Sequence, residues 1–167
     1  ATLTVLSGTT PPGAQFSAGG SQTMFIKADG SLWGTGMNSY GQLGDGTTTQ
    51  RTSPVQIAAG VASVAAADDD HMVFIKNDGS LWGTGRNEVG QLGDGTVTNR
   101  SMPVQAATGV VQAAAAGHTM FIKQGGALWG MGWNQFGQLG DATTTSRSSA
   151  VSIASGVTTV ATGNQHT

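Results

Sequence analysis

The sequence predicts an all-β fold assembled from repeated units, because three independent markers recur in one register. The segments Ser31–Gly36, Ser80–Gly85 and Ala127–Gly132 are centred on Leu-Trp-Gly, and their tryptophans lie 49 and 47 positions apart. Two further markers, Gly-Gln-Leu-Gly-Asp and Phe-Ile-Lys, keep this spacing. They begin at Gly41, Gly90 and Gly137, and at Phe25, Phe74 and Phe121. The 27 glycines and the single glutamate favour turn-rich β structure over long exposed helices.

Each unit begins with signals for a two-stranded hairpin. A first strand such as Val61–Val64 leads into a run rich in β-forming residues, Met72–Lys76. In that run Val73 and Ile75 face one way and Phe74 faces the other. A tight turn is predicted next, at Asp78-Gly79 in the second unit, because Asp-Gly tolerates positive φ angles.

Two more strands complete the unit. Leu-Trp-Gly closes the hairpin, and its glycines indicate close approach by a neighbouring element. After the Gly-Gln-Leu-Gly corner and a Thr-rich loop, Pro54–Ile57 and Pro103–Gln105 are typical of a short outer strand, since proline suits a sheet edge. Four strands at a period near 50 residues are typical of a β-propeller blade.

The order of these motifs resembles the RCC1 repeat family (regulator of chromosome condensation 1-like), in its bacterial form. The resemblance is carried by Gly156-Val157, Val160-Ala161, His118-Thr119, His166-Thr167, Trp33-Gly34, Asn38, Asn87, Asn134 and the three Gly-Gln-Leu-Gly blocks. It covers the chain from about Gly13 to Thr167. It implies three complete four-stranded blades and the start of a fourth, as part of a seven-bladed propeller.

The repeat markers divide the chain into five segments. We expect residues 1–12 to be the outer-strand remnant of a preceding repeat, 13–58, 59–107 and 108–154 to be repeats 1 to 3, and 155–167 to start repeat 4. An open array of three blades exposes apolar faces. We therefore expect either a longer parent chain or association of several copies, with a strand at Val157–Val160 pairing with a neighbouring chain.

Composition and motifs argue against several classes of function. Charged residues make up 10% of the chain, the net charge is -2 and the seven basic residues are scattered, so no nucleic-acid partner is expected. No apolar run is long enough for membrane insertion. No phosphate loop or nucleophile elbow is present, and cysteine is absent, so we expect neither an enzyme nor a cofactor.

Two groups of residues are candidates for metal ligands. One histidine per unit, at His71, His118 and His166, is structural in the family that the sequence resembles, and Gln22 replaces it in the first unit. Asp68, Asp69 and Asp70 are weak calcium candidates, because they lack the alternating spacing of a calcium loop. A solvated turn is the preferred interpretation. The recurring Asp45, Asp94 and Asp141 are expected to form Asx-type turns.

The loop before each Gly-Gln-Leu-Gly block varies while the scaffold repeats, which indicates partner binding. The candidate contact residues are Tyr40, Arg86, Glu88, Trp133, Gln135 and Phe136. The leading hypothesis is a non-enzymatic scaffold that presents these loops to a protein. The alternative is a structural subunit of an extracellular assembly or fibre that self-associates through open propeller ends.

Two activities known among similar propellers rank behind these hypotheses. They are guanine nucleotide exchange, for which no insertion provides a protruding wedge, and β-lactamase inhibition, which resemblance of fold cannot select. The low charge, the abundant threonine and glycine and the absence of cysteine favour an extracellular or cell-surface location.

Overall fold

The computed structural model describes residues 16–68, 70–163 and 166–167, and within them it contains strands and no helix. The strands are β1 (Phe16–Gly19), β2 (Gln22–Ile26), β3 (Leu32–Gly36), β4 (Arg51–Ala58), β5 (Val61–Ala66), β6 (His71–Lys76), β7 (Leu81–Gly85), β8 (Arg100–Ala107), β9 (Val110–Ala115), β10 (His118–Lys123), β11 (Ala127–Gly132) and β12 (Arg147–Ala154). The described part of the chain thus offers no helix with the length and apolarity needed to cross a bilayer.

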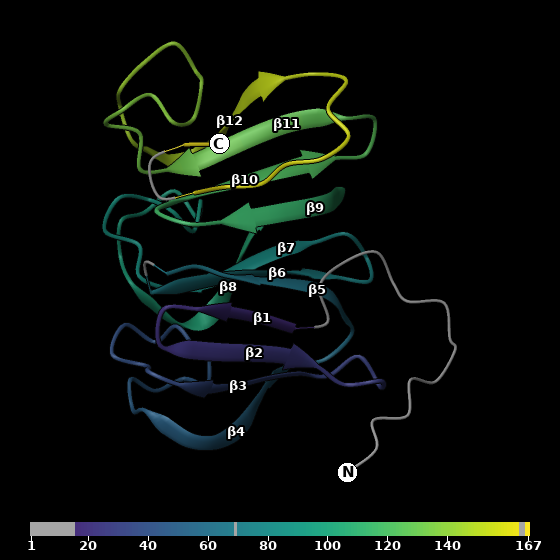
Figure 1. The fold of residues 1–167 in the computed structure, drawn as a ribbon, viewed down its shortest axis with the longest axis vertical. Coiled ribbons are helices and arrows are strands. Elements are labelled where there is room, and N and C mark those ends of the chain that lie inside the picture. Colours follow the sequence, from purple (N-terminus) through teal and green to yellow (C-terminus); the bar gives the residue numbers. More distant parts are fainter. Residues whose placement is uncertain (1–15, 69, 164–165) are drawn as a thin grey trace.

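The strands form three four-stranded antiparallel sheets, one per repeat, as the sequence predicts. Their orders are β1-β2-β3-β4, β5-β6-β7-β8 and β9-β10-β11-β12. The sheets are stacked along the long axis of the molecule (Figure 1), in the order of the sequence. Each is a meander, because every connection joins neighbouring strands. The three sheets are blades of one repeating design, and residues 1–12, expected to belong to a preceding repeat, lie outside the described residues.

The second strands of the second and third sheets, β6 and β10, are buried on both faces. In β6, Met72 and Phe74 belong to the apolar cluster shared with the first sheet, whereas Val73 and Ile75 pack with Phe121 of the third. The alternation predicted for this strand is therefore confirmed. The hydrophobic core lies between sheets, so each blade is stabilised by its neighbours.

Backbone hydrogen bonds also join successive repeats. At one end, Val61 N donates to Gly30 O and Val110 N donates to Gly79 O, both at 2.9 Å. At the other end of the strands, Gly46 N donates to Ser101 O at 2.8 Å, which ties a corner of the first repeat to the outer strand of the second. The stack is thus fixed by directional bonds as well as by apolar burial.

Val157–Val160, which we expect to pair as a strand with a neighbouring chain, has no strand partner within the described residues, and its pairing with another chain stays a prediction. In each sheet the first strand pairs with the second strand of its own repeat, and no described residue supplies that partner after Val160. The segment is held by one backbone hydrogen bond, from Val157 N to Gly126 O at 2.9 Å, and by side chains. Gln112 Nε2 donates to Val160 O at 3.2 Å, and Val157 and Val160 pack on the third apolar cluster.

One position in the third hairpin lacks a hydrogen bond that the other two repeats make. Trp33 Nε1 donates to Ser31 Oγ, and Trp82 Nε1 donates to Ser80 Oγ, each at 2.8 Å. In the third repeat the serine is replaced by Ala127, and the buried Trp129 Nε1 has no acceptor among the described residues.

We predict that Ala127→Ser stabilises the fold by about 1 kcal/mol, because it supplies an acceptor to a buried indole N–H. The free energy of unfolding in urea measures the effect. Ser80→Ala is the matched control and should destabilise by about 1 to 2 kcal/mol, since it removes the equivalent acceptor. An unchanged urea midpoint for Ala127→Ser would contradict the prediction.

A candidate protein-interaction surface

Three equivalent loops follow the third strand of each sheet and lie at one end of the strands, on the left-hand side of the blade stack in Figure 1. They comprise residues 37–40, 86–89 and 133–136, here called the variable loops. The second residue of each, Asn38, Asn87 or Asn134, is fully buried. A buried amide needs several partners, so these asparagines hold the loops in place.

The Asn87 side chain makes a complete set of hydrogen bonds. Its Nδ2 donates to Asp94 Oδ1, Thr96 O and Thr98 O at 3.1 Å each, and its Oδ1 accepts from Leu92 N at 2.9 Å. Asn38 and Asn134 repeat these bonds with the equivalent residues. One side chain thereby joins the variable loop, the Gly-Gln-Leu-Gly corner and the Thr-rich loop.

The recurring aspartate completes this network. Asp94 Oδ1 accepts from Thr96 N and Thr96 Oγ1 at 3.0 and 2.7 Å, and Asp94 Oδ2 accepts from Arg100 Nε at 2.8 Å. The expected Asx-type turn is confirmed, but the arginine partner was not foreseen. In the third repeat, hydrogen bonds from Thr143, Arg147 and Asn134 outweigh burial and lower the pKa of Asp141 to about 2. These aspartates are structural.

The glycine that follows each of the first two variable loops packs against the next repeat. Gly90 has a φ of 83°, and a Cβ there would overlap the backbone of Ser148 in β12. Gly41 bears the same relation to Ser101 in β8. The corner motif is therefore an element of blade packing.

The first two variable loops contact each other through candidate residues. The Arg86 guanidinium lies over the Tyr40 ring at 5.6 Å, and both its Nε and its Nη2 donate to Glu88 Oε2, at 2.9 and 2.8 Å. Glu88 keeps half of its side chain exposed. Three of the residues predicted for partner binding thus form one aromatic and charged group.

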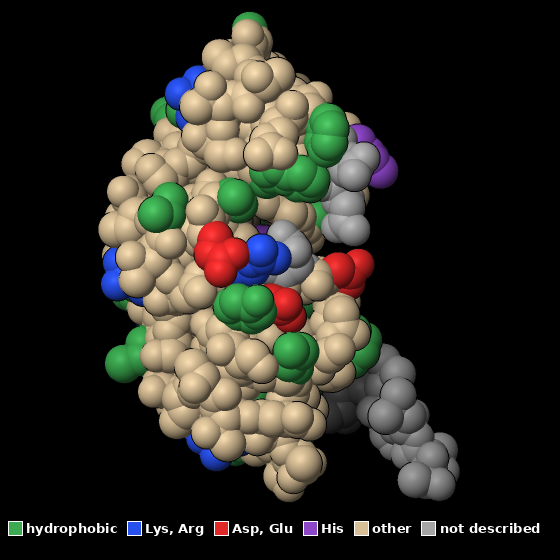
Figure 2. All heavy atoms as spheres, turned by 90° about the vertical axis from the view of Figure 1, so that its left-hand side faces the viewer, with side chains coloured by type: hydrophobic (Ala, Val, Ile, Leu, Met, Phe, Trp, Pro, Cys, Tyr) green, Lys and Arg blue, Asp and Glu red, His purple; other side chains and the backbone are tan. Residues whose placement is uncertain are grey.

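The third variable loop presents a pair of aromatic rings. Trp133 and Phe136 pack edge to face, with ring centroids 5.4 Å apart. Phe136 is 63% exposed, and Gln135 beside it is exposed as well. Figure 2 views this end of the molecule and shows acidic and basic side chains touching, with hydrophobic side chains around them.

The acidic turn between β5 and β6 lies beside the variable loops, a proximity that the sequence patterns did not predict. Asp68 Oδ1 accepts from Gly20 N at 2.7 Å, Asp70 Oδ1 accepts from Gln42 Nε2 at 3.0 Å, and Asp70 O accepts from Arg86 N at 2.9 Å. The proximity follows from the register of the β6–β7 hairpin. Because His71 pairs with Gly85, the residues before β6 lie beside the loop that follows β7. Asp69 lies outside the described residues, and no group of metal-ligating side chains occurs among those described.

His71 and His118 lie at the contacts between repeats, whereas His166 is exposed. The hydroxyl of Thr119 donates to Gln91 O at 2.8 Å, which leaves its oxygen to accept from His71 Nε2 at 3.1 Å. His118 and Thr167 repeat this arrangement, with a 2.7 Å separation. His71 and His118 therefore each link their repeat to the next, in agreement with a structural role.

The first interface replaces both members of the histidine–threonine pair. Gln22 occupies the histidine position and donates through Nε2 to Ala67 O and His71 O, at 3.3 and 3.1 Å. Met72 occupies the threonine position and packs in the apolar cluster. The two substitutions lie at one interface.

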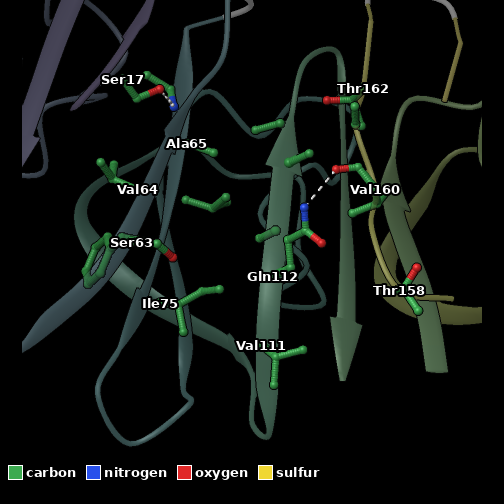
Figure 3. A pocket seen from close by; sticks show the side chains of 17 residues that line it. Ser17, Ser63, Val64, Ala65, Ile75, Val111, Gln112, Thr158, Val160 and Thr162 are labelled. Carbon is green, nitrogen blue, oxygen red and sulfur yellow. Dashed lines mark hydrogen bonds between the residues drawn. The ribbon is translucent and has the colours of Figure 1, made fainter. Parts of the chain in front are cut away.

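A concave cavity of about 670 Å³ lies along the first strands of the repeats. In Figure 3 the labelled side chains that line it are small and uncharged, and two hydrogen bonds span its sides: Ala66 N donates to Ser17 Oγ, and Gln112 Nε2 donates to Val160 O. The lining offers no charged side chain. Its chemistry gives no support for catalysis.

Comparisons with known sequences agree with the repeat pattern. A family profile described as "Regulator of chromosome condensation (RCC1) repeat" matches residues 29–75, 78–122 and 125–167, and a second profile with this description matches residues 14–42 and 61–91. The ultraviolet-B receptor UVR8 of Arabidopsis thaliana is 43% identical over 44 residues, which cover 26% of this chain and 10% of UVR8.

Solved structures show the same fold. Human WBSCR16 aligns with a TM-score of 0.74 and 25% identity over 84% of this chain and 37% of its own. Prp20p from Saccharomyces cerevisiae, described with its binding to Gsp1p and histones, aligns with a TM-score of 0.74 and 18% identity. The alignment covers 84% of this chain and 38% of Prp20p. Yeast RCC1 (Prp20) bound to Kap60 aligns with a TM-score of 0.74 and 19% identity over 89% of this chain and 39% of its own. The chain thus spans less than two fifths of each solved chain.

At the first interface Gln22 and Met72 replace the histidine–threonine pair, which predicts that positions 22 and 72 are energetically coupled. Met72→Thr alone should cost about 2 to 4 kcal/mol, because it opens a cavity, and Gln22→His alone should also destabilise. The double variant should cost at least about 1 kcal/mol less than the sum, since a histidine at position 22 and a threonine at position 72 can make the bond seen at the next interface. Urea unfolding of all four proteins measures the coupling, and strictly additive costs would refute it.

The histidine contact also predicts a pH dependence of stability. Burial, with a smaller effect of His166, lowers the pKa of His118 from 6.5 to about 4. The unfolded chain therefore binds the proton first, and this contribution to stability, complete above pH 6.5, is lost as the pH falls from about 6.5 to about 4.

We predict that His118→Gln costs about 1 kcal/mol or less at pH 7.5, since Gln22 fills the equivalent site, and that it weakens the loss of stability on acidification. Thermal unfolding midpoints at pH 7.5 and 5 measure both effects. The exposed residue His166 provides the control, because His166→Gln should leave most of the pH dependence in place. If His118→Gln lost as much stability between pH 7.5 and 5 as the wild type does, the assignment of this pH dependence to His118 would be wrong.

Proposed function

Because the chain belongs to the RCC1 repeat family, we propose that it is a non-enzymatic β-propeller scaffold that recognises a protein partner through its variable loops. The observation that carries this proposal is the contrast between a constant framework and changing exposed side chains. The buried asparagine and its aspartate recur in all three loops. The exposed side chains around them do not recur.

The character of the changing side chains supports recognition of a protein. Tyrosine, tryptophan and arginine are enriched at the energetic centres of protein interfaces. Tyr40, Arg86 and Trp133 supply one in each loop, and Phe136 adds an exposed ring. A framework fixed by buried hydrogen bonds also lowers the entropy lost when these side chains are ordered on binding.

The solved relatives support a binding role without identifying the partner. Yeast Prp20 is described with Gsp1p, histones and Kap60, all of which are proteins. Its identity to this chain is below 20%, so the likeness concerns the fold and its partners are not transferred. Seven blades, self-association through open ends and an extracellular location stay predictions.

A non-enzymatic role agrees with the structural bonds that the aspartate and histidine side chains make. Asp45, Asp94 and Asp141 are held by threonine and arginine hydrogen bonds, and low pKa values keep them ionised. His118 is fully buried and bonded to Thr167. These groups stabilise the fold, and their repetition in successive repeats is not what a single active site requires.

We predict that Trp133→Ala weakens binding of the natural partner by about 1 to 3 kcal/mol, because it removes a large ring from the proposed contact. A partner first isolated with the wild-type chain from the source cells, then purified, is titrated calorimetrically against wild type and variant. Circular dichroism establishes that the variant remains folded.

Val97→Ala provides the control for this titration. Val97 is 60% exposed in the Thr-rich loop outside the variable loops, so its removal should leave affinity unchanged. Equal affinities for wild type and Trp133→Ala would exclude the variable loops as the contact surface.

A further inference from the structure

The hairpins at the end of the strands opposite the variable loops (Figure 1) carry a recurring group of four side chains. In the second repeat, Ser80 Oγ donates to Asp78 Oδ1 at 2.6 Å and accepts from Trp82 Nε1 at 2.8 Å. Lys76 lies over the Trp82 ring at 4.6 Å. Hydrogen bonds from Ser80 and, to a smaller extent, the charge of Lys76 lower the pKa of Asp78. The first repeat contains the same group, made of Asp29, Ser31, Trp33 and Lys27.

The third repeat keeps the lysine and the tryptophan of this group but has neither oxygen-bearing side chain. Lys123 lies over the Trp129 ring at 4.7 Å. Gly125, with a φ of 85°, takes the place of the aspartate, and Ala127 takes the place of the serine. Lys123 therefore has no carboxylate in its own hairpin to balance its charge, and its ammonium attracts an anion.

A second cavity, of about 410 Å³, lies beside this lysine and tryptophan, between the second and third sheets. Two of its lining residues are smaller than those at the equivalent positions of the first interface. Ala106 replaces Ile57, and Ala150 replaces Pro103. Ile57 packs on the apolar cluster of the first interface. Both replacements thus remove side-chain volume next to Trp129, where the cavity lies.

The lining of this cavity combines one positive charge with apolar and aromatic surface. Lys123 carries the charge, and the rings of Phe121 and Trp129 are stacked with their centroids 6.5 Å apart. Gln105 and Thr108 are exposed and add an amide and a hydroxyl, and the remaining lining residues are alanines. Its volume suits a small molecule, because ligand pockets in proteins measure about 300 to 1,000 Å³.

We propose that this cavity binds a small molecule in which a carboxylate is attached to a flat ring. The carboxylate pairs with the Lys123 ammonium, in place of the aspartate that the third hairpin lacks. The ring packs against Trp129 and the alanines, which offer it aromatic and apolar surface. This site lies at the opposite end of the strands from the variable loops, so the inference goes beyond the proposed function and does not depend on it.

Two probes, β-naphthoate and β-naphthamide, test the inference because they share a ring system and differ in charge. The indole N–H signals of the 4 tryptophans in a proton–nitrogen correlation NMR spectrum, assigned with single Trp→Phe variants, show where each probe binds. Naphthoate should shift the Trp129 signal in a saturable way, with a Kd at least about tenfold lower than that of naphthamide. Equal affinities of the two probes, or shifts spread evenly over all the indole signals, would overturn the inference.

Lys123→Gln tests the role of the charge. It removes the ammonium, so the variant should bind naphthoate about tenfold more weakly and lose the preference for naphthoate over naphthamide. Lys76→Gln is the matched control, because Lys76 also lies over a tryptophan but has an aspartate in its own hairpin. It should leave the affinity for naphthoate unchanged. Equal losses in the two variants would show a general effect of net charge and contradict the site.

Ala106→Ile tests the cavity itself. The first interface carries Ile57 at this position, so the repeat accommodates the larger side chain. The variant should keep the urea midpoint of the wild type and bind both probes at least about tenfold more weakly, because the isoleucine fills the space that the ring needs. If Ala106→Ile lowers the midpoint, Ala106→Val provides a smaller filling with the same expected direction. Wild-type affinity for naphthoate in a folded filled variant would show that the cavity is not the site.

Discussion

The structure depends on burying both faces of β6 and β10, the second strands of the second and third sheets. A strand such as β6 has apolar side chains on both faces, so its sheet is complete only when a sheet lies on either side. The apolar clusters consequently form between repeats. The glycine corners and the histidine contacts also join successive sheets.

The buried asparagine separates framework from surface within a loop of four residues. Because the Asn87 side chain provides bonds to several parts of its repeat, its neighbours have little part in holding the loop. Those neighbours are free to differ between repeats at small cost in stability. The same division explains how loops of one conformation can present an ion pair in one repeat and an aromatic pair in another.

Much of the fold could be predicted from the sequence, because its signals are local and repeated. Four strands per unit, the opposite orientation of Val73 and Phe74, and the turn at Asp94 all follow from short patterns. Contacts between residues far apart in the chain could not be predicted so easily. Such contacts depend on how two sheets stack. They include the position of Arg86 over Tyr40, the acidic turn beside the variable loops, and the replacement of histidine and threonine by Gln22 and Met72 at the first interface. Val157–Val160 has a local β signal but no strand assignment among the described residues, because such a signal forms a strand only where another strand pairs with it.

The histidine–threonine contact gives the repeats a fixed order. Each repeat contributes one half of a contact to the repeat before it and the other half to the repeat after it, and the second repeat has the histidine but carries Met72 where a threonine would stand. If recombination placed the second repeat after the third, its methionine would face His118. The buried imidazole ring of His118 would then lose its hydrogen bond. The units are therefore alike in fold without being interchangeable, and gene duplication or shuffling within such an array preserves a sound structure only when neighbouring repeats change together.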